Sequence, residues 1–117
     1  MSQPSTQQPS GIKRTILQTL PIPELPGWES RLVLLEYPPG FAAPLHTHPR
    51  ACTGYILEGN VASQWEGKEV EHYSAGDSFI DLGDDLHVRS ENANADKWLR
   101  MINSYVIKVG EPNVVMA

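Results

Sequence analysis

The chain has 117 residues, 40% of them hydrophobic, and a formal net charge of −5, which fits one ordinary domain with a core of its own. Its positive residues form no basic run, so nucleic acid is not an expected partner, and no apolar stretch approaches the roughly 20 residues of a membrane span. The single cysteine, Cys52, excludes an internal disulfide and a structural zinc site built on cysteine pairs.

Residues 1–11 are rich in Ser, Gln and Pro and show no hydrophobic periodicity. This composition predicts a flexible N-terminal tail, followed by a single folded domain over residues 12–117. The tail also lacks the apolar centre of a secretory signal, so we expect a cytoplasmic location and no membrane partner.

From Ile12 onward, short segments rich in Val, Ile, Leu, Tyr and Trp alternate with Pro and Gly, and none has the period of an amphipathic helix. The pattern predicts an all-β sandwich or barrel, with a hairpin turn at Glu66-Gly67. We expect strands at residues 13–19, 30–37, 43–47, 53–58, 61–65, 68–73, 78–82, 86–90 and 97–109.

The most informative residues are His46 and His48, which are two positions apart. Residues at this spacing point to the same face of a strand, and Pro44 and Pro49 keep the segment extended, so both imidazoles could share one metal ion. Taken alone, the pair is equally compatible with chance on an exposed strand. Two observations favour a site: the pair follows an apolar segment, and His87 begins another strand that a barrel could bring to the same interior.

Residues 40–59, GFAAPLHTHPRACTGYILEG, resemble the first motif of the cupin family, G-x5-H-x-H-x3–4-E-x6-G, with complete spacing. Residues 76–91, GDSFIDLGDDLHVRSE, resemble the second motif, G-x5-P-x-G-x2-H-x3-N, at its first Gly and its His. The resemblance covers residues 12–110. It implies an antiparallel cupin-type β-barrel, also called a double-stranded β-helix or jelly roll.

The resemblance also implies one divalent transition metal inside the barrel, held by two histidines and a glutamate of the first motif and a histidine of the second. His46, His48 and His87 match these positions, whereas Cys52 stands where the glutamate is expected. The metal could be Fe, Zn, Ni, Mn or Cu.

The second motif departs from the family pattern at three positions. Leu82 replaces its Pro, Asp84 its second Gly and Glu91 its Asn, although Asn92 comes next. An Asp84-Asp85 pair therefore stands in place of a rigid turn before the histidine.

Cys52 leaves two alternatives for the metal. A thiolate is a soft ligand that suits Zn or Cu, which makes Cys52 a candidate fourth ligand. The alternative, which we favour, is a buried neutral thiol beside a site of three histidines.

Other polar residues near the second motif are weaker candidates for chemistry. Arg89 lies two residues after His87, so we expect it on the same face, where it could orient an anionic substrate or form a salt bridge. Because the histidines would be ligands, a general base must come from elsewhere, and the candidates are Asp81, Asp84, Asp85 and Glu91. His72 is expected to be solvated.

We favour a metal-dependent enzyme of oxygenase, decarboxylase, isomerase or hydrolytic type that acts on a small organic molecule. The alternatives are a non-catalytic small-molecule or metal-binding module and a metal-free isomerase or cyclase. By analogy with other small barrels we expect a homodimer, with the strand near residues 12–19 as the exchanged element.

Overall fold

The computed structural model describes residues 11–116, so the tail predicted over residues 1–11 lies outside the described residues apart from Gly11. The described part is all β and forms no helix, which confirms the predicted fold class. It therefore holds no helix of the length and apolarity that crossing a membrane requires. The strands are β1 (Lys13–Pro21), β2 (Trp28–Tyr37), β3 (His46–Thr47), β4 (Cys52–Glu58), β5 (Asn60–Trp65), β6 (Glu71–Ser74), β7 (Ser78–Asp81), β8 (His87–Asn92), β9 (Leu99–Lys108) and β10 (Val115–Met116).

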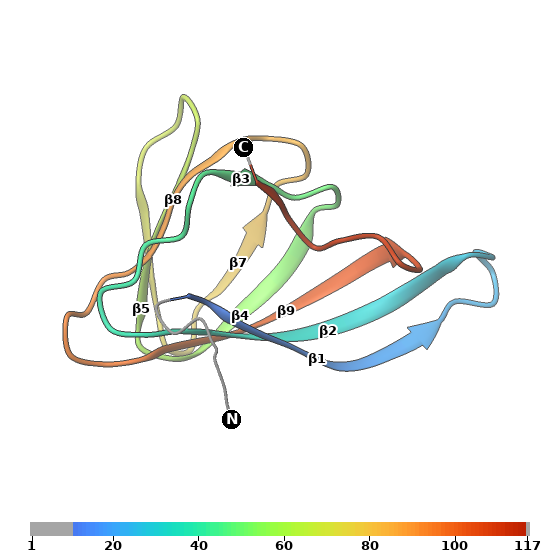
Figure 1. The fold of residues 1–117 in the computed structure, drawn as a ribbon, viewed down its shortest axis with the longest axis horizontal. Helices are drawn as coiled ribbons and strands as arrows, with labels where there is room; N and C mark the ends of the chain where they lie inside the picture. The colour runs from blue at the N-terminus through green and yellow to red at the C-terminus, as the bar shows by residue number, and fades with distance from the viewer. Residues whose placement is uncertain (1–10, 117) are drawn as a thin grey trace.

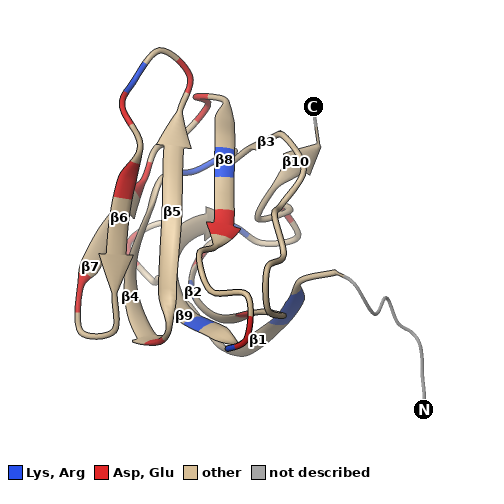
Figure 2. Ribbon diagram, turned by 90° about the vertical axis from the view of Figure 1, so that its left-hand side faces the viewer, with Lys and Arg blue, Asp and Glu red and all other residues tan. Residues whose placement is uncertain are grey.

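The strands form two five-stranded sheets, with orders β1-β2-β9-β4-β7 and β10-β3-β8-β5-β6. All pairings are antiparallel. Figure 1 shows the long β1, β2 and β9 running together away from the rest of the barrel, and Figure 2 shows β6, β5 and β8 side by side in the second sheet. Apart from the consecutive pairs β1–β2 and β5–β6, neighbours in each sheet are far apart in sequence, which is how residues of both predicted motifs come to face one interior.

Period-2 alternation decides which side chains enter the space between the sheets. In β2 the buried residues include Val33, Leu35 and Tyr37, with less buried residues between them. In β9 the alternate positions from Leu99 to Ile107 are buried in the same way. These inward rows make most of the hydrophobic core.

The second sheet brings the two histidine-bearing segments together. β3 is much shorter than the predicted strand at residues 43–47, because Pro44 has no N–H for a ladder. β3 pairs with β8 at a single position, His46 opposite His87, and with β10 on its other side. β10 has two residues, which is too short to produce a readable sequence pattern.

A bulge in β8 sets the direction of the residues after His87. Trp65 of β5 is opposite His87, but the next residue, Gln64, is opposite Arg89, so Val88 is an extra residue in β8. The shift places Asn92 on the inward face, where its amide donates hydrogen bonds to three backbone carbonyls, of Tyr37, Pro38 and Lys97. The bulge therefore explains why this Asn follows His87 one position later than the family pattern.

Candidate metal centre

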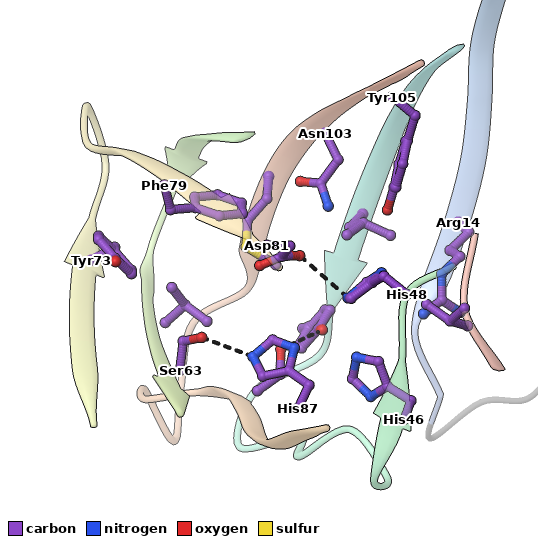
Figure 3. Close-up of a pocket in the computed structure, with 16 residues that line it drawn as sticks. Arg14, His46, His48, Ser63, Tyr73, Phe79, Asp81, His87, Asn103 and Tyr105 are labelled. Atoms are coloured by element: carbon purple, nitrogen blue, oxygen red, sulfur yellow. Dashed lines mark hydrogen bonds and ion pairs between the residues drawn. The ribbon is translucent and has the colours of Figure 1, made fainter. Parts of the chain in front are cut away.

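Three histidines from two adjacent strands of the second sheet and the loop after β3 converge between the sheets (Figure 3). His46, His48 and His87 are each 3% exposed. Ring centroids are 5.0 Å apart for His46 and His48, 5.0 Å for His46 and His87, and 5.9 Å for His48 and His87. One ligand atom from each ring lies within 4.8 Å of the other two. The structure thus brings together the three histidines that the sequence singles out.

Backbone carbonyls fix the tautomers of two of these rings. The Nδ1–H of His46 donates to the carbonyl of Pro44 at 2.7 Å, and that of His48 donates to the carbonyl of Asn113 at 3.1 Å. The proton is then on Nδ1, so the lone pair of each ring is on Nε2. This is the arrangement in which histidines ligate metals, with the second nitrogen held by an outer partner.

His87 is held from two other directions. Its ring stacks on Trp65 with centroids 3.9 Å apart and planes 12° apart, and its Nε2 is 2.8 Å from the Ser63 hydroxyl oxygen. Both partners come from β5, next to β8 in the sheet. The ring is therefore clamped before any ligand arrives, which lowers the entropy cost of binding one.

Burial keeps all three imidazoles neutral. Loss of solvent lowers the pKa of His46, and it lowers the pKa of His48 to about 4 and that of His87 to about 3, with repulsion from neighbouring rings adding to the effect at His48 and His87. A neutral imidazole is the form that coordinates metal. Near neutral pH the cluster can accept a cation without first losing a proton.

Unpartnered atoms give a direct test of whether this cluster suits a metal. Nε2 of His48 and Nδ1 of His87 are buried and have no hydrogen-bond partner. A buried polar atom without a partner costs about 1–3 kcal/mol, and a divalent cation would satisfy both atoms at once. The three imidazoles therefore fit a divalent transition metal.

A buried carboxylate borders the cluster. Asp81 ends β7, is 7% exposed, and places Oδ2 3.4 Å from Nε2 of His48. Because burial keeps His48 neutral, this contact is not a charged ion pair, and the lone pair on Nε2 of His48 faces the carboxyl group. Burial also raises the pKa of Asp81 to about 7. A cation between the two groups would bind the lone pair of His48 Nε2 and would stabilise the ionised form of Asp81.

Cys52 is a buried neutral thiol. It is 4% exposed, burial raises the pKa of its thiol, and its S–H donates to Oδ2 of Asp81 at 3.8 Å. Among the described residues, the convergent group contains the three histidines and not this sulfur. The structure therefore favours the neutral-thiol alternative of the two that the sequence left open.

The pocket beside the histidines is narrow, with a cavity volume of about 20 Å³. Phe79, Met101 and Tyr105 line it, as does Asn103, whose amide is fully buried. The far end of the Phe79 ring can approach β4 closely because the residue opposite it is Gly54, where an added Cβ would clash with the ring. Tyr55, the residue after Gly54, is 48% exposed on the outer face.

The structure does not bring the other predicted residues to this pocket. The expectation that Arg89 shares the face of His87 is wrong, because the bulge at Val88 turns Arg89 outward, where it forms an ion pair with Glu91. Asp84 and Asp85 are exposed on the turn before β8, and Asp84 adopts a positive φ of 64°. His72 is exposed, as predicted.

Sequence reasoning missed Asn103 and Ser63 and gave Asp81 only the role of a base. Asn103 had a readable signal, because it is a polar residue within the alternating inward row of the last strand. Ser63 and Asp81 had none, since their roles depend on which strands become neighbours.

Two facing antiparallel sheets with a histidine cluster between them define the class of double-stranded β-helix proteins. The family model described as "Cupin domain" matches residues 33–87, which include all three histidines. Residues 33–87 thus match the cupin domain, and the fold of the described chain agrees with that match. No curated protein matches the chain.

Solved structures give the same fold. An uncharacterised conserved protein with a double-stranded β-helix domain from Klebsiella pneumoniae is 18% identical, with a TM-score of 0.69, over 96% of this chain and 89% of that one. An oxalate oxidase in complex with the substrate analogue glycolate is 21% identical, with a TM-score of 0.69, over 97% of this chain and 59% of that one. A DMSP lyase from Ruegeria pomeroyi is 19% identical, with a TM-score of 0.62, over 75% of this chain and 43% of that one. The chain thus spans well under two thirds of the two named enzymes.

Proposed function

We propose that this chain is a metal-dependent cupin enzyme that acts on a small organic molecule bound between its two sheets. The observation that carries the proposal is the convergence of three buried imidazoles, two of which, His48 and His87, have a buried ring nitrogen with no hydrogen-bond partner. Histidines that served only packing would have both nitrogens bonded or solvated.

Each group of pocket residues has a separate role in this proposal. His46, His48 and His87 would hold the metal, which when bound would act as a Lewis acid toward a substrate oxygen. Asp81 supplies the carboxylate that the first motif lacks, from the neighbouring strand, and it can hold a proton at Oδ2. Phe79 and Met101 exclude bulk water from the pocket.

Two of the similar structures are enzymes that by name act on small organic molecules, an oxalate oxidase and a DMSP lyase. Both activities belong to proteins much longer than this chain, so neither is transferred to it. They support only the coarser proposal, a small substrate in the space between the sheets.

The test is elemental analysis of the untagged protein, purified without chelator and then offered Fe²⁺, Mn²⁺, Ni²⁺, Cu²⁺ or Zn²⁺. We expect about one bound metal ion per chain in the wild type and a large loss in His46→Ala and His48→Ala. His72→Ala is the matched control, because this exposed histidine is outside the pocket. Full occupancy in both cluster variants would overturn the site.

A metal-free cupin is the second candidate, and the observation that favours it is Cys52, a neutral thiol where the family has its acidic ligand. Wild-type protein that stays empty after all five metals are offered would support this alternative. The pocket would then serve as an acid–base site or a binding module.

A further inference from the structure

Asn103 has a buried amide that the proposed metal site does not use. Its side chain lines the pocket, is 0% exposed, and has no hydrogen-bond partner at either Nδ2 or Oδ1. Leaving both ends of an amide unbonded in a protein interior is costly, and buried amides are nearly always satisfied. A ligand that both donates and accepts a hydrogen bond would satisfy this one.

Arg14, on the edge strand β1, also lines the pocket. The other arginines form ion pairs with carboxylates. Within residues 11–116, Arg14 forms no such pair. A guanidinium that lines a pocket and has no carboxylate partner itself can bind a ligand carboxylate in a forked, two-bond geometry.

Arg14 stands close enough to influence the cluster. It is opposite Leu35 in the β1–β2 register, and Leu35 is part of the pocket wall. After burial, its positive charge is among the causes that lower the pKa of His46 and His48. Figure 3 shows Arg14 and Asn103 on two sides of His48 in that view.

The charges around the pocket favour an anion. Imidazole ligands bring no charge to a metal, and Asp81 is the one carboxylate among the described residues that line the pocket, so it alone would compensate a divalent cation there. Even with Asp81 ionised, one positive charge would remain at the metal, and Arg14 adds a second. Such a pocket attracts an anionic ligand and disfavours its neutral analogue.

From these contacts we propose that the pocket binds a short hydroxycarboxylate, with Arg14 holding the carboxylate and the Asn103 amide bonding the hydroxyl. A hydroxyl fits because it can donate to Oδ1 or accept from Nδ2, as the amide requires. This inference rests on the proposed metal-dependent function, but Arg14 and Asn103 are not among the three histidines that would hold the metal.

The test is isothermal titration of the full chain, metal-free and loaded with redox-inert Zn²⁺, against glycolate, acetate and glycolamide. Glycolamide lacks the negative charge of glycolate, and acetate lacks its hydroxyl. We expect glycolate to bind about tenfold more tightly than either, because glycolamide loses the charged contact with Arg14 and acetate loses the hydrogen bond with the Asn103 amide.

Each variant should remove one preference only. Arg14→Gln should abolish the preference for glycolate over glycolamide, and Asn103→Leu should abolish the preference for glycolate over acetate. Lys13→Gln is the matched control, because it removes the same charge from the adjacent position of β1, outside the pocket. Circular dichroism and thermal melts establish that each variant folds.

The outcomes separate this inference from the metal proposal. If Zn²⁺ binds but glycolate and glycolamide bind equally, the inference fails and the metal site stands. If the protein takes up no Zn²⁺, the same titrations on the metal-free chain decide: an Arg14-dependent preference for the acid supports the inference, and its absence overturns it. A preference that survives both variants also overturns it.

Discussion

Cys52 and Asp81 face each other across β4 and β7, with Sγ 3.8 Å from Oδ2. Cys52 occupies the position where the cupin motif has its acidic ligand. The acidic group beside that position is instead Asp81, from the neighbouring strand β7. The carboxylate of Asp81 is close to the histidine cluster, with Oδ2 3.4 Å from Nε2 of His48.

Asp81→Asn should therefore weaken metal binding, because it removes the single carboxylate beside the cluster while keeping its size. We expect a loss of about 10–100-fold in affinity, the range for partners around a metal site. Cys52→Ala should bind metal nearly as well as the wild type. Competition with a metal-chelating dye measures the metal affinity of both variants. A larger loss of affinity in Cys52→Ala than in Asp81→Asn would show that the sulfur is the ligand.

Ser63→Ala tests how His87 is positioned. The Ser63 hydroxyl bonds Nε2 of His87 at 2.8 Å, and without it the ring can rotate on Trp65. We expect metal affinity to fall by about tenfold, with the fold intact by circular dichroism. Ser104→Ala is the control, since Ser104 is an exposed serine on the outer face of β9. Unchanged affinity in Ser63→Ala would mean that the stack on Trp65 alone fixes the ring.

The histidine pair and its partner could be predicted from the sequence because local rules govern them. Prolines keep His46 and His48 extended, and the spacing puts both on one face. Asp81 needed the β4–β7 register, and Ser63 needed the β5–β8 pairing, which are contacts between distant segments that no local pattern specifies. Arg89 was misplaced for a related reason: a one-residue bulge reverses the face of every residue after it.

Asn103→Leu should stabilise the protein while removing a recognition group. The amide is fully buried with both polar atoms unbonded, and each such atom costs about 1–3 kcal/mol, whereas Leu has a similar size and no polar atoms. We expect a gain of about 1 kcal/mol or more in the free energy of unfolding, measured with urea. Leu99→Ala, which leaves a cavity in the core, should lower the free energy of unfolding by about 2–5 kcal/mol in the same assay. A destabilised Asn103→Leu would show that the amide bonds an internal group.

The metal-free protein should lose stability in acid. Burial lowers the pKa of His48 to about 4 and that of His87 to about 3, from 6.5 in the unfolded chain. Below about pH 6.5 the unfolded chain therefore binds more protons than the folded one, so stability falls as the pH drops toward 4. Asp81 acts in the opposite sense, because burial raises its pKa to about 7 and its contribution is lost as pH rises.

The histidines outnumber this single carboxyl, so the net effect between pH 7 and 5 should be a loss. Urea unfolding with chelator present measures it. His87→Phe keeps a ring on Trp65 but cannot take up a proton, and it should show a smaller loss than the wild type over the same range. Equal losses would assign the acid sensitivity to other groups.

The homodimer predicted from the sequence has a candidate face on the outer side of the first sheet. Tyr55, Ile80 and Val106, on the adjacent strands β4, β7 and β9, are 48%, 61% and 51% exposed. A second copy would cover this apolar face in the same way on both chains, which a twofold dimer requires. Ile80→Lys together with Val106→Glu should shift the mass measured by light scattering from dimer to monomer. Ile16→Lys, on the exposed edge strand β1, distinguishes the alternative in which the dimer forms by pairing that strand, because it should leave a face-to-face dimer intact.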